Sequence, residues 1–189
     1  MKKIAIFASG AGSNAKRIID HFKDSKLAKV ELIVCNDKGA GVLQIASAEN
    51  IEIVVIEKAE FNRTGYVREL KDRHIDFIAL AGFLWKLPEI LIKTFPGKIV
   101  NIHPALLPAY GGKGMYGAAV HKAVIGAKEK KSGITIHYVD EQYDHGNIIF
   151  HATCVVAFDD TPGSLAEKIH TLEHKYYPEQ IEKILRDDF

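Results

Sequence analysis

The chain has 189 residues, of which 47% are apolar and 26% are charged. This length and composition are typical of one sizeable hydrophobic core, so we expect a single domain over residues 1–189. The 25 basic residues nearly balance the 24 acidic ones, which leaves a formal charge of +1. So small a charge argues against general binding to nucleic acids or membrane surfaces, and any anionic ligand must be held by local groups.

The cysteines and the hydropathy pattern favour a reducing, cytoplasmic setting. Cys35 and Cys154 lie in apolar stretches and lack the close spacing of a metal or redox pair, so we expect two buried thiols. The apolar run after Met1 stops at Ser9 and Gly10, too early for a signal peptide. No later stretch is long enough to span a bilayer.

In the first half of the chain, short apolar runs alternate with segments of helical period. This alternation predicts a mostly parallel sheet with helices on both faces, and the continuous apolar runs indicate strands that are buried on both sides. We therefore expect an α/β fold of three layers, α/β/α, that is Rossmann-like. The expected strands are Lys3–Ala8, Val30–Asn36, Glu52–Ile56, Phe77–Ala81 and Ile99–Ile102, and the expected helices are Ser13–Phe22, Gly41–Glu49, Gly65–His74 and Pro88–Thr94.

The pattern changes after Asn101, where two prolines and a cluster of glycines up to Gly126 interrupt the regular alternation. We expect a long functional loop there. Ile134–Val139 and Asn147–Ala157 read as two further strands, joined by a short polar turn and paired at least partly antiparallel. A final helix opens at Thr161 and Pro162.

The glycine-rich turn from Ser9 to Ala15 connects the first expected strand to the first expected helix. Unpaired backbone N–H groups and the positive end of the helix dipole face this position, which therefore suits an anion such as a phosphate. Gly10 and Gly12 let the backbone approach the anion closely, while Ser13 and Asn14 add side-chain hydrogen bonds.

Two other interpretations of this turn remain open. Gly10, Gly12 and Ala15 also match the dinucleotide-binding pattern, and Asp37 follows at about the spacing of the acidic residue that binds a ribose, some 20 residues on. By this turn alone, the chain would be a nicotinamide enzyme. Alternatively, Ser13 or Asn14 only caps the helix.

Asn101 and His103 stand two residues apart at the end of an expected strand, so their side chains project from the same face. Ligands of open parallel sheets bind at the carboxyl ends of the strands. The plain alternative is that both side chains only satisfy backbone groups. Asp144 likewise reads, by itself, as an ordinary turn aspartate.

An ordered set of motifs runs through the chain: Ser-Gly-x-Gly-Ser-Asn from Ser9, Leu-Ala-Gly-Phe from Leu80, Asn-Ile-His-Pro-Ala-Leu-Leu-Pro from Asn101, and Asp-x-Gly from Asp144. In this order they resemble the folate-dependent formyltransferases. Within that superfamily the chain is similar to the enzymes that act on glycinamide ribonucleotide. The tRNA enzymes and the hydrolases carry an additional domain, which we do not expect here. A sugar nucleotide or a charged tRNA is the alternative acceptor.

The resemblance implies transfer of a formyl group from 10-formyltetrahydrofolate to the amine of glycinamide ribonucleotide, without a metal. Such a transfer needs an oxyanion stabiliser and a route for protons. We assign the oxyanion to Asn101, a second hydrogen bond and proton transfer to His103, and the orientation of a protonated His103 to Asp144. Whether His137 faces this site or only packs beside it is left open.

The resemblance also implies binding residues. The N-terminal half would hold the ribonucleotide and the C-terminal half the folate, in a monomer or homodimer that binds neither nucleic acid nor membrane. Ala11 and Ala105 replace polar residues frequent in relatives, and Trp85 with Lys86 replaces a shorter apolar residue and an arginine. The expected contacts are Gly12, Ser13 and Asn14 to the phosphate, Glu173 to the glycinamide or ribose, and Arg63, Leu84, Trp85, Lys86, Leu87, Asn101 and Asp140 to the folate.

Overall fold

The computed structural model describes residues 1–61 and 63–187. Of the single domain expected over residues 1–189, residue 62 and residues 188–189 lie outside this described part. The strands are β1 (Lys2–Ala8), β2 (Ala28–Cys35), β3 (Glu52–Val55), β4 (Phe77–Leu80), β5 (Ile99–His103), β6 (Lys131–Tyr138) and β7 (Ile148–Val155). The helices are α1 (Ser13–Phe22), α2 (Val42–Ala48), α3 (Lys58–Phe61), α4 (Thr64–Asp72), α5 (Glu89–Thr94), α6 (Ala118–Gly126) and α7 (Pro162–Asp187).

The described strands form one seven-stranded sheet in the order β3-β2-β1-β4-β5-β6-β7. Strands β3, β2, β1, β4 and β5 pair in parallel, whereas β6 pairs antiparallel with β5 and β7 pairs antiparallel with β6. This arrangement confirms the predicted α/β fold with an antiparallel C-terminal part. It also places the carboxyl ends of the parallel strands at one edge of the sheet.

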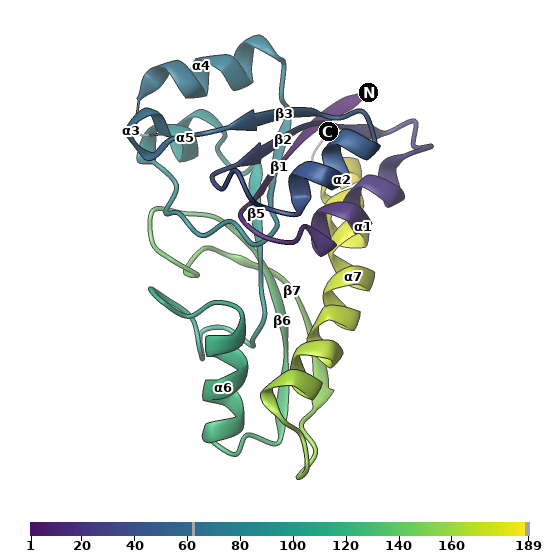
Figure 1. Cartoon of the computed structure of the whole chain (residues 1–189), viewed down its shortest axis with the longest axis vertical. Helices are drawn as coiled ribbons and strands as arrows, with labels where there is room; N and C mark the ends of the chain where they lie inside the picture. Colours follow the sequence, from purple (N-terminus) through teal and green to yellow (C-terminus); the bar gives the residue numbers. More distant parts are fainter. Residues whose placement is uncertain (62, 188–189) are drawn as a thin grey trace.

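Helices cover both faces of the sheet (Figure 1). Along β1, Ile4, Ile6 and Ala8 belong to one core cluster with α1, α2, α6 and α7, while Ala5 and Phe7 belong to a second cluster with α3, α4 and α5. Because successive side chains of a strand point to opposite faces, a strand between two helix layers must be apolar throughout. Burial of the strands on both faces therefore explains the continuous apolar runs of the sequence.

Several details differ from what the sequence predicted. The glycine-rich segment contains helix α6, whose Val120 and Val124 stand one turn apart and are buried. A short helix, α3, follows β3, and β6 begins at Lys131, three residues before the expected start of that strand. Cys154 is only half-buried because it lies on β7 at the edge of the sheet, whereas Cys35 is buried as expected.

Helix α7 crosses the layer on one side of the sheet and contacts α1, α6, β6 and β7. Its Tyr177 is fully buried, and the phenol donates hydrogen bonds to the carbonyls of Leu80 (2.9 Å) and Val100 (3.2 Å). These carbonyls belong to neighbouring strands close to the carboxyl edge of the sheet. Among the described residues, no helix is long and apolar enough to cross a membrane.

Candidate active site

A cavity of about 690 Å³ opens at the carboxyl edge of the parallel strands. A second cavity of about 600 Å³ adjoins it, because the segment from Leu84 to Leu87 lines both. The first cavity is lined by the turn before α1, the ends of β4 and β5, the turn after β6, the loop before α6, and one face of α7. It therefore gathers most of the residues that the sequence singled out.

The strand β5 presents Asn101 and His103 to this cavity. The antiparallel register sets Asn101 opposite His137 and His103 opposite Thr135 on β6. Side chains directly opposite each other in an antiparallel pair are within contact distance. His137 thus faces the site, which answers the question that its sequence position left open.

Asp144 reaches the same point from the turn between β6 and β7. Its backbone adopts the left-handed conformation, with φ 51°. Two residues later, a Cβ on Gly146 would lie only 1.9 Å from the carbonyl oxygen of Tyr138, so only glycine allows the turn to close this tightly. The backbone N–H of Gly112 donates to Asp144 Oδ2 (2.9 Å), which holds the carboxylate in the cavity.

Four polar side chains converge here, from β5, β6 and the turn after β6. Asp144 Oδ2 lies 3.5 Å from His103 Nδ1, and Asp144 Oδ1 lies 3.5 Å from Asn101 Nδ2 and 3.7 Å from His137 Nε2. His103 and His137 are 3% and 2% exposed. Polar groups so deeply buried need partners or a ligand, which makes this the chemically distinctive part of the cavity.

The hydrogen bonds around His137 define the orientation of the Asn101 amide. His137 Nδ1 donates to the carbonyl of Tyr138 (2.8 Å), so in the neutral ring Nε2 is an acceptor. Asn101 Nδ2 donates to that nitrogen (3.1 Å). Its second N–H faces Asp144 Oδ1 at 3.5 Å, a distance at which a hydrogen bond is weak. A ligand oxygen can therefore accept a hydrogen bond from this N–H in place of Asp144.

The two ring nitrogens of His103 have different partners. Nε2 donates to the carbonyl of Tyr110 (2.8 Å), while Nδ1 faces Asp144. Burial lowers the pKa of His103 below its ordinary value and outweighs the opposite effect of Asp144. The lowered pKa runs against the protonated imidazole expected from the sequence, because burial disfavours the charge more than the carboxylate favours it.

Asp144 itself is ionised. Burial raises the pKa of its carboxyl, but the neighbouring His137, the nearby imidazole of His103 and the N–H of Gly112 together lower this pKa below the ordinary value. A carboxylate oxygen and an imidazole nitrogen that carries a lone pair thus face each other. Such a pair of acceptors suits a ligand that brings N–H donors.

The turn before α1 forms another wall of the cavity. Gly12, the N-cap residue, has φ 83° and makes no side-chain cap, so the N–H groups of the first helical turn remain for a ligand. A Cβ on Gly12 would meet Val42 at 2.8 Å, whereas one on Gly10 would meet open space. Gly12 is therefore required by packing and backbone conformation together.

Asn14 and Glu173 contact each other across this wall. Asn14 Nδ2 donates to Glu173 Oε2 (3.0 Å), and Glu173 is 6% exposed. Burial raises the pKa of the Glu173 carboxyl, more than the contacts with Asn14 and His170 lower it. Asn14 Oδ1 is buried without a partner among the described residues. Because this free atom is an acceptor, it suits a hydroxyl or amine of a ligand better than a phosphate.

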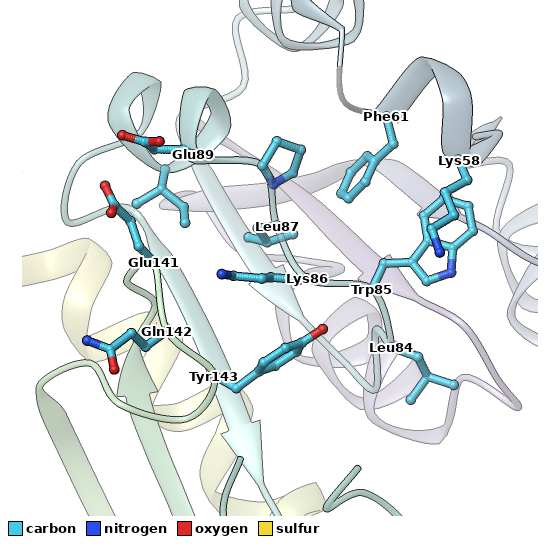
Figure 2. Close-up of a pocket in the computed structure, with 12 residues that line it drawn as sticks. Lys58, Phe61, Leu84, Trp85, Lys86, Leu87, Glu89, Glu141, Gln142 and Tyr143 are labelled. Carbon is cyan, nitrogen blue, oxygen red and sulfur yellow. The ribbon is translucent and has the colours of Figure 1, made fainter. Parts of the chain in front are cut away.

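The segment after β4 separates the two cavities. Figure 2 shows Glu89 and Glu141 at one end of the second cavity and Lys58 beside Trp85 at the other. Phe61, Phe83 and Trp85 form an aromatic cluster with ring centroids 5.6–6.2 Å apart. The predicted folate contacts that line the first cavity are Leu84, Trp85, Lys86, Leu87, Asn101 and Asp140.

Two residues named from the sequence are not brought into either cavity. Arg63 is exposed before α4 and lines neither one. Asp37, the acidic residue of the dinucleotide pattern, accepts a hydrogen bond from Gly39 (2.8 Å) within its own exposed turn. Asp37 lines neither cavity, which removes the main support for a nicotinamide site.

Other lining residues were missed by the sequence analysis. His121 of α6 and His170 of α7 line the cavity, as does the loop of residues 112–117. His121 is 4% exposed. The alanine-rich segment around His121 could have indicated a helix. The glycines on either side of that segment are more typical of a loop, so the helix was not predicted. In the described part of the chain, no three His, Cys, Asp or Glu side chains are placed to hold a metal ion.

Comparisons with known proteins agree with this geometry. The sequence profile of the formyl transferase family matches residues 2–181. The chain is 37% identical to the phosphoribosylglycinamide formyltransferase of Bacillus subtilis, over 98% of this chain and 95% of that protein. It is 40% identical to the chloroplastic phosphoribosylglycinamide formyltransferase of Arabidopsis thaliana over 98% of this chain, which spans 66% of that protein.

Solved structures give the same result. The phosphoribosylglycinamide formyltransferase of Bacillus halodurans superposes with a TM-score of 0.89 at 35% identity, covering 100% of this chain and 97% of that one. The glycinamide ribonucleotide transformylase 1 of Geobacillus kaustophilus gives a TM-score of 0.88 at 38% identity, covering 98% and 99%. The chain therefore belongs to the formyl transferase family, among the phosphoribosylglycinamide formyltransferases.

Proposed function

We propose that the chain transfers the formyl group of 10-formyltetrahydrofolate to the glycinamide amine of phosphoribosylglycinamide, with Asn101, His103 and Asp144 at the reacting carbon. The products are the formylated ribonucleotide and tetrahydrofolate. The observation that carries the proposal is the convergence of these three side chains in one cavity, with the N-terminus of α1 in another wall of it. An amide donor, a proton acceptor and an anion site are what this reaction requires.

The reaction begins when the lone pair of the amine attacks the formyl carbon. The new C–N bond places a negative charge on the formyl oxygen and a positive charge on the attacking nitrogen. The N–H of Asn101 that faces Asp144 over 3.5 Å would turn to the oxyanion. One well-placed donor to such an oxygen is worth roughly 3 kcal/mol in the transition state.

Protons then move from the attacking nitrogen to the leaving nitrogen. His103 Nδ1 and Asp144 Oδ2 are both acceptors, so they would bind the amine through its N–H groups. Once His103 has taken up a proton, it becomes a donor that Asp144 stabilises. Return of that proton to the folate nitrogen lets the C–N bond of the donor break, which leaves a formamide and a folate amine whose nitrogens carry no charge.

The two substrates occupy different walls. The phosphate of the ribonucleotide would bind the N–H groups of Gly12, Ser13 and Asn14, and the buried oxygen of Asn14, beside Glu173, would accept a hydrogen bond from the ribose or glycinamide. The folate would lie along Leu84, Trp85, Lys86 and Leu87, with Asp140 at its edge. Arg63 has no assigned contact, because it lies outside both cavities.

Turnover with defined acceptors tests the proposal. Purified protein is mixed with 10-formyltetrahydrofolate alone, with phosphoribosylglycinamide, with an amino-sugar nucleotide, or with charged tRNA, and tetrahydrofolate is measured. We expect rapid formation only with phosphoribosylglycinamide. Turnover with either of the other acceptors in its place, or equal turnover with none, would show that the proposal is wrong.

A further inference from the structure

His137 is buried beside the reacting groups, yet it has no part in the formyl transfer as proposed above. It stands on β6 directly opposite Asn101 of β5, and its ring is almost completely removed from solvent. A buried imidazole needs a partner for each of its two nitrogens, because an unpaired polar atom in the interior costs free energy. The partners of these nitrogens therefore indicate what the ring does.

The first nitrogen, Nδ1, lies 2.8 Å from the carbonyl oxygen of Tyr138. A carbonyl can only accept a hydrogen bond, so Nδ1 carries the hydrogen and the neutral ring is the Nδ1–H tautomer. The turn after β6 approaches the same oxygen closely, because a Cβ on Gly146 would lie only 1.9 Å from it. The turn that carries Asp144 thus leaves this carbonyl little room to move away from His137.

The second nitrogen, Nε2, keeps its lone pair and faces the Asn101 amide. Asn101 Nδ2 lies 3.1 Å from Nε2 and 3.5 Å from Asp144 Oδ1. Both neighbours are acceptors, so both favour the amide nitrogen over the amide oxygen at this position. The contact with Asp144 is weak at 3.5 Å, so the orientation of the amide depends mainly on His137.

We propose that His137 is a positioning residue of the formyl transfer: as the Nδ1–H tautomer it accepts a hydrogen bond from Asn101 and keeps the amide nitrogen turned toward the reacting carbonyl. The role of Asn101 in this statement rests on the proposed function. A half-turn of the amide would bring its oxygen to the developing oxyanion, where two acceptors repel each other. His137 acts through Asn101 by preventing that half-turn.

Asp144 alone cannot hold the amide in this orientation during the reaction. In the proposed mechanism the N–H that faces Asp144 over 3.5 Å turns to the oxyanion, while the other N–H stays on His137 Nε2. The amide therefore needs one acceptor that keeps its hydrogen bond throughout turnover. An imidazole lone pair meets this need, since it adds no further negative charge close to the oxyanion.

The tautomer can be observed in the free protein, without any turnover. Nitrogen NMR spectra at mildly alkaline pH distinguish a ring nitrogen that carries hydrogen from one that carries a lone pair, and the His137 signals are assigned from their loss in His137→Gln. We expect the hydrogen on Nδ1, although free histidine places it mostly on Nε2. A ring with its hydrogen on Nε2 would overturn the proposal, because it could not accept from Asn101.

Two substitutions separate the acceptor from the bulk of the ring. Glutamine places an amide oxygen near the position of Nε2, whereas leucine has similar bulk and no acceptor. We expect His137→Leu to lower kcat by roughly tenfold to 100-fold with little change in KM, because the donor of Asn101 is then misplaced. His137→Gln should recover most of this kcat. The matched control His151→Leu should keep the wild-type kcat, because His151 is exposed on β7 and lines neither cavity.

A double-mutant cycle distinguishes this positioning role from a structural one. Once Asn101 is replaced by alanine, His137→Leu should lower kcat little further, because no amide is left to orient. Equal losses of kcat with and without the Asn101 side chain, in variants that all unfold cooperatively, would contradict the positioning role. A His137→Leu variant with the kcat of the wild type would contradict it as well. Should that variant not fold, the ring tautomer of the wild type still decides the question.

Failure of the proposed function gives a different pattern. Formylation of another acceptor, with the same coupling between His137 and Asn101, would support the positioning role and contradict the assigned acceptor. Formylation of phosphoribosylglycinamide without that coupling would do the reverse.

Discussion

His103 and Asp144 illustrate how burial and charge compete at one residue. The carboxylate favours a protonated imidazole, but burial acts more strongly and lowers the pKa of His103. With Nε2–H bound to the Tyr110 carbonyl, the neutral ring turns its lone pair toward the carboxylate. A lowered pKa suits a ring that accepts a proton from a substrate during the reaction.

This state of His103 can be measured in the free protein. We expect the His103 ring to titrate in an NMR experiment with a midpoint below its ordinary value of 6.5, with the signal assigned from its loss in His103→Gln. In Asp144→Asn the midpoint should fall further, because the carboxylate raises this pKa. A midpoint above 6.5, or an upward shift in Asp144→Asn, would contradict the assignment.

Among the donors of the site, loss of the Asn101 side chain is expected to lower turnover most. Asn101→Ala should lower kcat by roughly 100-fold to 1,000-fold with little change in KM, because its N–H acts on charge that develops in the transition state. Steady-state kinetics, with thermal unfolding as the control for folding, provide the measurement. A variant that loses affinity while it keeps its kcat would assign Asn101 to binding instead.

The sequence predicted Asn101, His103 and Asp144 because each stands in a short motif at a strand end or turn. The sequence did not show whether His137 faces the site, because the position of that side chain depends on the register between β5 and β6. Only the antiparallel pairing of β5 with β6 places His137 opposite Asn101, and neither strand's own residues specify that alignment. The same reason explains why the order of hydrogen bonds around the Asn101 amide was not foreseen.

Between elements, Thr135 ties the loop after β5 to β6. Its hydroxyl donates to the carbonyl of Ala105 (2.7 Å) and accepts from the N–H of Leu107 (2.9 Å). All three residues are buried, so water cannot replace this group. The hydroxyl therefore fixes the loop that follows His103.

Removing this hydroxyl should destabilise the fold. Thr135→Val has a similar shape but leaves a buried donor and a buried acceptor unpaired, which costs about 1–3 kcal/mol of unfolding free energy. Urea denaturation measures the loss, and Thr135→Ser, which keeps the hydroxyl, should recover most of it. Equal stability of Thr135→Val and the wild type would show that the loop is held by other contacts.

At the scale of elements, the parallel strands were predictable because burial on both faces demands uninterrupted apolar runs. Helix α6 was not, although Ala118, Ala119 and Ala123 are good helix formers. Gly117 and Gly126 border it, and glycines that start and end a helix resemble the glycines of a loop when only the sequence is read. The short helix α3 has too few residues for a helical period to be detected.

For the whole molecule, buried histidines set the expected response of stability to acid. The pKa values of His103, His121 and His174 are lowered mainly by burial, so below about pH 6.5 the unfolded chain takes up protons that the folded chain does not. Their contribution to stability is therefore lost as pH falls. Glu173 acts oppositely, because its raised pKa penalises the folded state increasingly as pH rises above 4.5.

We expect the three histidines to prevail over the one glutamate. The urea midpoint should decrease between pH 7 and about pH 5, before carboxylates with lowered pKa, such as Asp160 at about 2, begin to protonate. His121→Gln should reduce the slope. A midpoint that stays constant or rises toward pH 5 would mean that the buried histidines take up protons without cost.

The fold class was predictable from the order of strands and helices, and the family from the ordered motifs. The arrangement of the cavity was not, because it depends on how α6 and α7 approach the turn before α1. These helices are distant in sequence from that turn, and only tertiary packing brings His121, His170 and Glu173 to it.

A crystal structure of the chain with phosphoribosylglycinamide and a non-transferable analogue of 10-formyltetrahydrofolate tests the central claim most directly. We expect the phosphate on the N–H groups of the first turn of α1, the analogue's carbonyl oxygen within hydrogen-bond distance of Asn101 Nδ2, and the glycinamide nitrogen between His103 and Asp144. A phosphate bound elsewhere, or a carbonyl out of reach of Asn101, would contradict it.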